Sequence, residues 1–187
     1  MLEVDIDNCI PTLVWNELVS IIGADDEDGL AEFHMIELAV KNYRVWRAFL
    51  QEYLDVSASE AKKVLIGLFF TAFPKNDLPF LWSLRKLLAS ASQIILGSRS
   101  YEYLANKFSD RKNPRATRFS YALFGKEDHI LSELQETLQR IIPRAAVLSY
   151  MFDGAIFKLP ADEVDLVQDA VKVVSEKHQV TMKVTVF

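Results

Sequence analysis

The clearest structural signal in the chain lies in residues 147–159, whose sequence is VLSYMFDGAIFKL. Two apolar runs flank the pair Asp153-Gly154, and an Asp-Gly pair in this setting strongly indicates a β-hairpin, because its turn favours positive φ angles. A carboxylate at the tip of a hairpin can also hold a metal ion. Asp153 therefore has two interpretations, as a turn former and as a metal ligand.

A helix and further strands are predicted around this hairpin. Residues 161–177 carry apolar residues at helical spacing, and residues 180–187 (VTMKVTVF) alternate like a half-buried strand. Near the other end of the chain, residues 2–6 (LEVDI) also predict a strand. The sequence thus predicts an α+β fold with an antiparallel sheet of about four strands, from residues 2–6, 146–152, 155–159 and 180–187.

The middle of the chain is predicted to be mostly helical. Expected helices cover residues 12–22, 30–54, 58–70, 79–96, 100–108 and 117–142. Ser57 and Glu60 have the spacing of a capping box, and Pro74 and Pro143 end the helices before them. No repeat or linker divides the chain. We expect one domain with a strand and helix over residues 1–22, a helical region over 30–142, and a hairpin, helix and strand over 143–187.

Composition excludes several classes of protein. Of the 187 residues, 50% are hydrophobic, with only 6 Gly and 6 Pro, which suits one folded core and not a disordered chain. The absence of a long apolar run or an N-terminal leader predicts a soluble chain in the cytoplasm or nucleus, away from membranes. A predicted strand begins at residue 2, so we expect flanking domains or other subunits to complete the protein.

One segment is strongly basic although the net charge is −5. Its five cations lie within twelve residues: Lys107, Arg111, Lys112, Arg115 and Arg118. Such a segment attracts nucleic-acid phosphates without regard to sequence, and its composition equally suits a solvated loop. The histidines, His34, His129 and His178, are scattered without metal-ligand spacing, so the sequence predicts no histidine metal site.

The order of strand, aspartate turn, strand, helix and strand resembles the motif C region of family A DNA polymerases. Val4-Asp5-Ile6, followed by a helix, is similar to motif A of that family. The sequence around Asp5 looks closer to that of divergent viral and mobile-element relatives. The resemblance implies that Asp5 and Asp153 hold Mg²⁺ ions, which bridge the attacking and leaving oxygens in phosphoryl transfer. Asp7 lies on the same side of the strand and is an alternative to Asp5, unless Asp7 or Asn8 only caps the helix.

A third segment, residues 61–71 (AKKVLIGLFFT), resembles motif B, the fingers helix of the same family. Lys62 falls at the lysine that meets the nucleotide phosphates, Gly67 matches the internal glycine, and Phe70 replaces the tyrosine on which a base stacks. A cation at this place can neutralise charge on the leaving pyrophosphate. An ordinary exposed helix lysine would have the same local sequence.

Several positions depart from the family pattern, which leaves activity open. The fingers arginine falls at Ala58 and the following aromatic at Ile66, while the Tyr-Gly pair becomes Phe70-Thr71. The motif A glutamate that screens the sugar falls at Ile10. In motif C, Phe152 and Gly154 replace the His and Glu beside the aspartate.

The resemblance implies a palm-and-fingers core that transfers nucleotides to a DNA primer-template from nucleoside triphosphates, with Mg²⁺ as cofactor. Lys62, Ile66, Phe70 and Ile10 would line the nucleotide site, and the basic segment would contact nucleic acid. The alternative is a catalytically degenerate polymerase-like domain that binds nucleic acid or a protein. A reverse transcriptase is a third interpretation, although no Tyr-x-Asp-Asp box is present.

Overall fold

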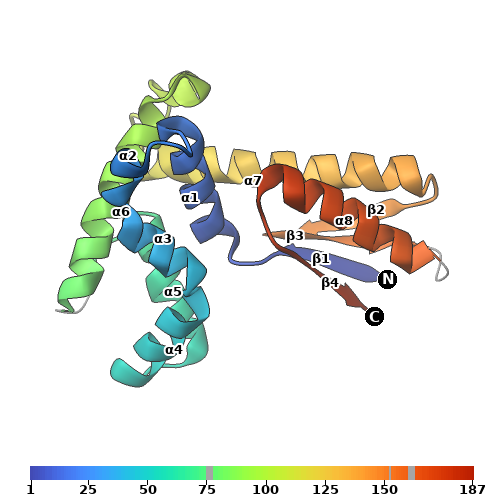
Figure 1. Ribbon diagram of the computed structural model, residues 1–187, viewed down its shortest axis with the longest axis horizontal. Coiled ribbons are helices and arrows are strands. Elements are labelled where there is room, and N and C mark those ends of the chain that lie inside the picture. Colours follow the sequence, from blue (N-terminus) through green and yellow to red (C-terminus); the bar gives the residue numbers. More distant parts are fainter. Residues whose placement is uncertain (75–77, 152, 160–162) are drawn as a thin grey trace. The chain divides into compact units, whose positions relative to one another are not determined.

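The computed structural model describes residues 1–74, 78–151, 153–159 and 163–187, and the chain forms two compact units (Figure 1). The sheet unit comprises Met1–Cys9 and Phe124–Phe187, and the helical unit comprises Ile10–Leu123. The helices α1 (Cys9–Ile22) and α7 (Pro114–Ile141) contribute residues to both units.

The sheet unit contains a four-stranded antiparallel sheet, as the sequence predicts. Its strands are β1 (Leu2–Ile6), β2 (Ala146–Met151), β3 (Gly154–Lys158) and β4 (Met182–Val186), in the spatial order β2-β3-β1-β4. The α+β fold class with about four strands is therefore confirmed. Residue 152, the predicted end of the second strand, lies outside the described residues.

One face of this sheet is apolar and covered. In β1, Leu2, Val4 and Ile6 are buried, whereas Glu3 and Asp5 point to the other face and are half-buried. Tyr150 lies opposite Ala155 on the covered face, and its hydroxyl donates a hydrogen bond to Gln135 on α7. The second half of α7 therefore covers the face of the sheet that carries Val4.

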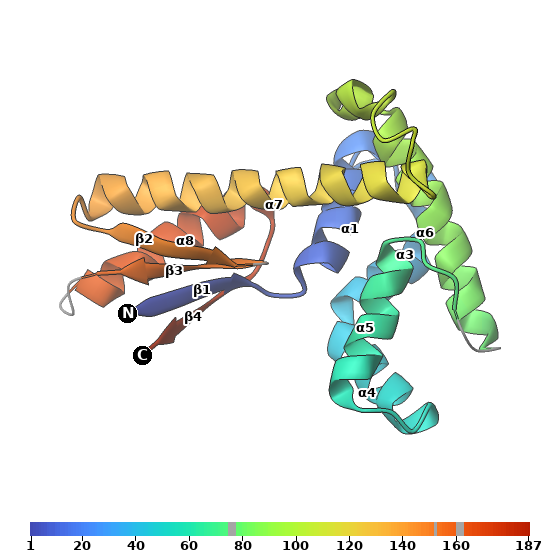
Figure 2. The ribbon, with the colours of Figure 1, turned by 180° about the vertical axis from the view of Figure 1, so that it is seen from behind.

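The helix α8 (Val164–His178) covers the same face beside β4 (Figures 1 and 2). A surface pocket lies between them, and its lining includes Val171 from α8 together with Met182 and Val184 from β4. Met182 and Val184 pair with Ile6 and Val4, so they belong to the covered face. The core that results includes Ile130, Leu134, Leu138, Phe157, Val167, Ala170 and Val174.

The helical unit contains α2 (Glu27–Ala31), α3 (His34–Lys41), α4 (Tyr43–Tyr53), α5 (Ala58–Phe69), α6 (Pro79–Gly97) and a 3-10 helix (Arg99–Leu104). The predicted capping box is confirmed: Ser57 Oγ accepts from the Glu60 N–H at 3.2 Å, and the Ser57 N–H donates to Glu60 Oε2 at 3.0 Å. Buried apolar side chains of the unit include Leu13, Leu18, Ile36, Leu50, Leu65, Phe69, Leu84, Leu88 and Phe119.

The single helix predicted over residues 30–54 is wrong, because the chain breaks at two places into α2, α3 and α4. Asn42 leaves the helical conformation, with φ −112° and ψ 26°, and its side-chain amide donates to the Leu38 carbonyl at 3.1 Å. The same carbonyl also accepts the Asn42 backbone N–H at 2.9 Å, so the side-chain bond adds a second donor at the end of α3. Phe33, at the other break, is buried and has φ −100°.

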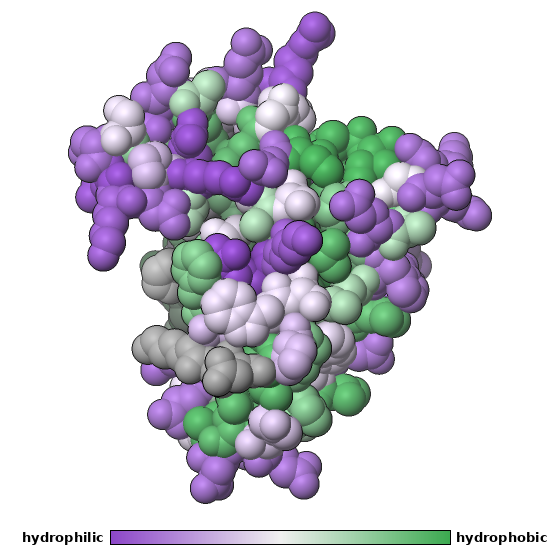
Figure 3. All heavy atoms as spheres, turned by 90° about the vertical axis from the view of Figure 1, so that its left-hand side faces the viewer, coloured by the Kyte–Doolittle hydropathy of each residue, from purple (hydrophilic) through white to green (hydrophobic). Residues whose placement is uncertain are grey.

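Apolar side chains also reach the surface of the helical unit. Phe49, Tyr53, Phe73 and Trp82 are each more than 40% exposed. Figure 3 shows hydrophobic and hydrophilic residues intermixed on the face it presents. Among the described residues, no helix combines the length and the hydropathy that crossing a membrane requires.

Candidate active site on the sheet

Asp5 lies at the centre of the sheet, on the face that α7 and α8 do not cover. It is opposite Gly154 on β3 and opposite Lys183 on β4. Directly opposed residues of antiparallel strands point their side chains to the same face. The Asp5 carboxylate therefore projects over the Gly154 position, half-buried between two neighbouring strands.

Gly154 makes room for this carboxylate. A Cβ at residue 154 would approach the Val4 carbonyl oxygen to 2.7 Å and Asp5 Oδ1 still more closely. Both approaches are closer than a carbon atom tolerates, and one of the atoms is backbone. Any side chain larger than that of glycine at residue 154 would therefore displace Asp5.

Asp153 is held just before β3 by hydrogen bonds of its own backbone carbonyl and N–H. Its carbonyl accepts from the Ile6 N–H at 2.7 Å, and its own N–H donates to Glu127 Oε1 at 2.7 Å. Its φ is +61°, the left-handed conformation that aspartate tolerates better than most residues. The predicted turn is present, and Asp153 is the turn residue immediately before β3, which pairs with β1. Phe152, the predicted departure from the family pattern beside Asp153, lies outside the described residues.

Glu127 supports this turn from α7, although it is absent from the predicted site. The residue is only 5% exposed, and the Cys9 thiol also hydrogen-bonds its carboxylate. Burial, with added repulsion from Asp153 and Asp128, raises the pKa of the Glu127 carboxyl despite these hydrogen bonds. Burial and the charges of Glu127 and Asp153 likewise raise the pKa of the Cys9 thiol.

The sequence contained a signal for Glu127. It lies in the apolar stripe of α7 that continues through Ile130, Leu134 and Leu138, where a carboxylate is unexpected. Charged residues are almost never fully buried unless they have partners, so a lone glutamate in such a stripe points to a specific contact. Here the contact is the Asp153 N–H.

Glu3 is a second acidic residue that the sequence analysis missed. It lies two residues before Asp5 on the same face of β1. Partial burial, the charge and hydrogen bonding of Asp5, and the charge of Asp153 raise the pKa of the Glu3 carboxyl. Glu3 and Asp5 therefore place two carboxylates on this face, and the charge of Asp153 also acts on Glu3.

Asp7, the alternative metal ligand, has a different environment. Its Oδ1 accepts from Lys183 Nζ at 2.6 Å, in an ion pair between β4 and the end of β1. Lys183 is the strand partner of Asp5 on β4, but its ammonium group forms the ion pair with Asp7. The ammonium group of Lys183 thus engages one oxygen of Asp7, and the metal-ligand roles of Asp5 and Asp7 stay predictions.

A shallow pocket opens beside Glu127. It encloses about 540 Å³ and is lined by Phe124, Glu127, Asp128, Tyr150 and Met151, which come from α7 and β2. Aromatic rings and carboxylates thus surround a hollow next to the hairpin that carries Asp153.

The predicted nucleotide-binding residues belong to the helical unit. Lys62 is exposed on α5, Ile66 is half-buried one turn later, and Phe70 is half-buried at the C-cap. Their spacing of four places them along one side of the helix. Ile10 is only 9% exposed in α1. The roles of these residues stay predictions.

The basic segment divides into two groups. Arg115 donates to the Ala89 carbonyl and, at 3.0 Å, to Ser92 Oγ on α6, while Arg118 donates to the Ala105 carbonyl. Desolvation, with repulsion from Arg85 and Arg118, lowers the pKa of the Arg115 guanidinium. Lys107, Arg111 and Lys112 are exposed, with Lys107 over the Tyr103 ring. The exposed group is the part of the segment best placed to meet phosphates.

Comparison with known proteins gives limited information. No protein-family model matches the sequence, and no curated protein matches it. A solved structure that the chain partly resembles is the POL domain of Pol1 from M. smegmatis, in complex with DNA primer-template and dNTP. Sequence identity is 12% and the TM-score is 0.46, over 98% of this chain and 38% of that chain. A match at this level identifies no family.

Substituting Gly154 tests the close approach of β1 and β3. We expect Gly154→Ala to lower the free energy of unfolding by about 1–3 kcal/mol, because the added methyl group forces Asp5 and the Val4 backbone aside. Urea denaturation measures the change. Gly125→Ala is the matched control, since nothing lies within 4 Å of a Cβ at residue 125 of α7. That control should be stabilised, as alanine favours a helix by about 1 kcal/mol over glycine. Equal effects of both substitutions would contradict the predicted crowding.

The raised pKa of Glu127 predicts a specific pH dependence of stability. A group whose pKa is higher in the folded protein stabilises it below the unfolded value, here 4.5, and this contribution is lost as pH rises through the folded pKa. Glu127→Gln keeps a carbonyl acceptor for the Asp153 N–H but carries no charge. We expect its stability relative to the unmodified chain to increase from acid to neutral pH in urea titrations. A pH-independent difference for Glu127→Gln would refute the explanation.

Proposed function

We propose that this chain is the palm-and-fingers core of a nucleotidyltransferase that extends a DNA primer on a template. The observation that carries the proposal is the junction of β1 and β3. There the Ile6 N–H donates to the Asp153 carbonyl at 2.7 Å, and the Asp5 carboxylate lies against Gly154. Asp5 on β1 and Asp153, in the turn just before β3, are 148 positions apart in the sequence and lie at this junction.

The chemistry of this junction suits a divalent cation. Mg²⁺ prefers hard oxygen ligands and keeps several waters, so two protein carboxylates can hold it. The raised pKa of Glu3, caused by partial burial and then by Asp5 and Asp153, indicates negative charge that a bound cation would offset. Asp5 and Asp153 are the proposed ligands, with Asp7 as the alternative to Asp5.

When bound, a pair of Mg²⁺ ions would promote attack by the primer 3′-hydroxyl and offset charge on the leaving pyrophosphate. The residues of the chain hold the proposed metal ligands in place. Glu127 fixes the backbone of Asp153, and Gly154 leaves space for the Asp5 carboxylate. Lys62, with Ile66, Phe70 and Ile10, is proposed to bind the nucleotide. Lys107, Arg111 and Lys112 are proposed to meet nucleic-acid phosphates.

One observation favours the alternative of a degenerate polymerase-like domain. Ile10, at the position of the motif A glutamate, is apolar and 9% exposed, so it has no polar group for the sugar. Ala58 also lacks the cation that the family pattern places there. Each lost preorganised donor can cost on the order of 10²–10³ in rate, so the proposed activity is slow. DNA binding without extension, in a folded protein, would identify the alternative.

Primer extension with Mg²⁺ tests the function directly. We expect slow extension that Asp5→Asn or Asp153→Asn reduces to background, because each substitution removes a charged metal ligand. Asparagine also tolerates the positive φ of residue 153, so the fold is kept. Asp169→Asn, on the exposed face of α8, is the control and should extend normally. Extension that survives both aspartate substitutions would show that the activity lies elsewhere.

The role of Lys62 is tested against its neighbour. Lys62 and Lys63 are both exposed on α5, so replacing either by alanine should change the free energy of unfolding by less than about 0.5 kcal/mol. We expect Lys62→Ala to raise KM for the nucleotide about tenfold or more, the effect of losing one charged hydrogen bond. Lys63→Ala should leave KM unchanged. Equal increases for both variants would indicate only a general loss of positive charge.

A further inference from the structure

A second cluster of potential ligands lies in the sheet unit, away from the aspartates. His129 and Glu133 are four residues apart on α7, and His178 is the last residue of α8. One ligand atom from each lies within 4.8 Å of the others, a three-residue grouping that the described part of the chain shows nowhere else. The sequence analysis expected no histidine metal site, and this juxtaposition corrects that expectation. The i, i+4 spacing of His129 and Glu133 on one helix was a signal in the sequence for a shared site. His178 lies 45 residues beyond Glu133, so no signal in the sequence indicated its place in the cluster.

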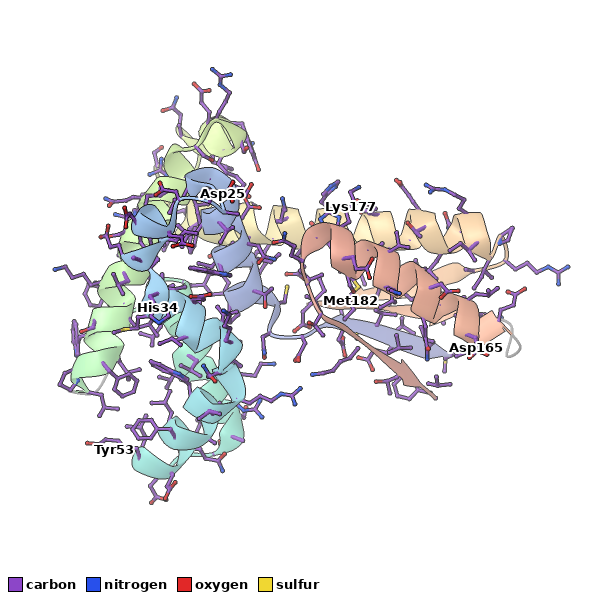
Figure 4. The ribbon with its side chains drawn as sticks, viewed as in Figure 1. Asp25, His34, Tyr53, Asp165, Lys177 and Met182 are labelled. Atoms are coloured by element: carbon purple, nitrogen blue, oxygen red, sulfur yellow. The ribbon has the colours of Figure 1, made fainter. Side chains whose placement is uncertain are left out.

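The cluster is partly ordered by its own contacts. His178 Nε2 lies 2.9 Å from Glu133 Oε2, and Lys177 donates to the other oxygen, Oε1. The rings of His129 and His178 meet edge to face, with centroids 5.6 Å apart and planes at 89°. The side chains of His178 and Glu133 are 9% and 20% exposed. Figure 4 labels Lys177 at the end of α8 that lies beside α7.

The backbone fixes where His178 lies. Gln179 adopts the left-handed conformation, with φ 53° and ψ 41°, and ends α8 immediately after the histidine. The Val180 N–H then donates to the Ser175 carbonyl at 3.0 Å. The last turn of the helix is thereby closed, and the imidazole is presented to α7 from a defined position.

The cluster is distinct from the candidate active site. Successive residues of an α-helix are rotated by about 100°, so His129 and Glu133 lie about 200° and 240° around α7 from Glu127. Glu127 faces the Asp153 turn. The two histidines and Glu133 therefore occupy the opposite side of the helix.

We propose that His129, Glu133 and His178 bind a divalent transition-metal ion of the zinc class, with water as the fourth ligand. Two imidazoles and one carboxylate suit Zn²⁺, whereas Mg²⁺ prefers oxygen ligands alone. Ligand atoms of a tetrahedral zinc at ~2.0–2.1 Å lie ~3.3 Å from one another. His178 Nε2 and Glu133 Oε2 are near that separation. The exposed side chain of His129 would rotate to bring the third ligand nitrogen to the ion.

The ion would join α7 to α8, the two helices that cover the sheet. Lys177 engages Oε1 and not the oxygen that faces His178, so binding at Oε2 leaves that ion pair in place. Because the ligands come from separate helices, the complete site exists only in the folded protein. Metal binding should therefore stabilise the native state.

The test compares thermal unfolding of metal-stripped protein with and without Zn²⁺, alongside calorimetric titration of Zn²⁺ alone. We expect one ion per chain, and a rise in Tm of about 5–10 °C when free Zn²⁺ is about 100 times its Kd. Co²⁺ in place of Zn²⁺ should give the visible absorption bands of a tetrahedral site. None of these measurements depends on nucleotidyl transfer.

His129→Ala is the informative variant, because His129 is exposed and losing its ring contact with His178 should lower the metal-free Tm by only a few degrees. It should lose most of the Tm rise and weaken Zn²⁺ binding at least tenfold. His34→Ala, in the helical unit, is the matched control and should behave as the unmodified chain. The proposal is overturned if the stripped protein binds no Zn²⁺, or if His129→Ala binds it as tightly as the unmodified chain. The cluster would then be an ion pair between α7 and α8 alone.

Discussion

The pairing of β1 with both of its neighbours is the constraint on which the sheet unit depends. β1 lies between β3 and β4, so it joins the hairpin on one side to the last strand on the other. Its alternation sends Leu2, Val4 and Ile6 into the core and Glu3 and Asp5 to the opposite face. A register shift of one residue would exchange the two sets and bury the carboxylates. The hydrophobic pattern of this short strand therefore also determines the face on which the acidic residues are presented.

The buried carboxylate of Glu127 shows how the core and the candidate site are coupled. Burying a charge is unfavourable unless it is hydrogen-bonded, and Glu127 has the Asp153 N–H and the Cys9 thiol as partners. These contacts do not cancel the effect of burial, since the pKa of Glu127 stays raised. A leucine at this position would extend the apolar stripe of α7, but it would leave the Asp153 N–H without this acceptor. The buried charge of Glu127 thus lowers stability, while its hydrogen bond to the Asp153 N–H fixes the backbone at the tip of the hairpin.

Local patterns predicted the fold well where they were strong. Alternating residues and the Asp153-Gly154 pair located all four strands, and the Ser57–Glu60 capping box located the start of α5. The breaks at Phe33 and Asn42 were missed because helical spacing of apolar residues continues across them, while the backbone of these two residues leaves the helical conformation. Asp5 and Asp153 were chosen through resemblance, whereas Glu3, Glu127 and the His129–His178 contact depend on which strands and helices become neighbours. A sequence pattern within one element does not contain that information.

The central position of β1 has a consequence for the order in which the protein folds. Asp5 pairs with Gly154 and with Lys183, so its partners are separated from it by 149 and 178 positions. The entropy of closing such long loops must be overcome before these pairings contribute, whereas helices and hairpins form from nearby residues. We therefore expect the hairpin and helices to form early and β1 to be incorporated last. Until then β3 has an unpaired edge, and such edges are the surfaces through which incompletely folded chains associate.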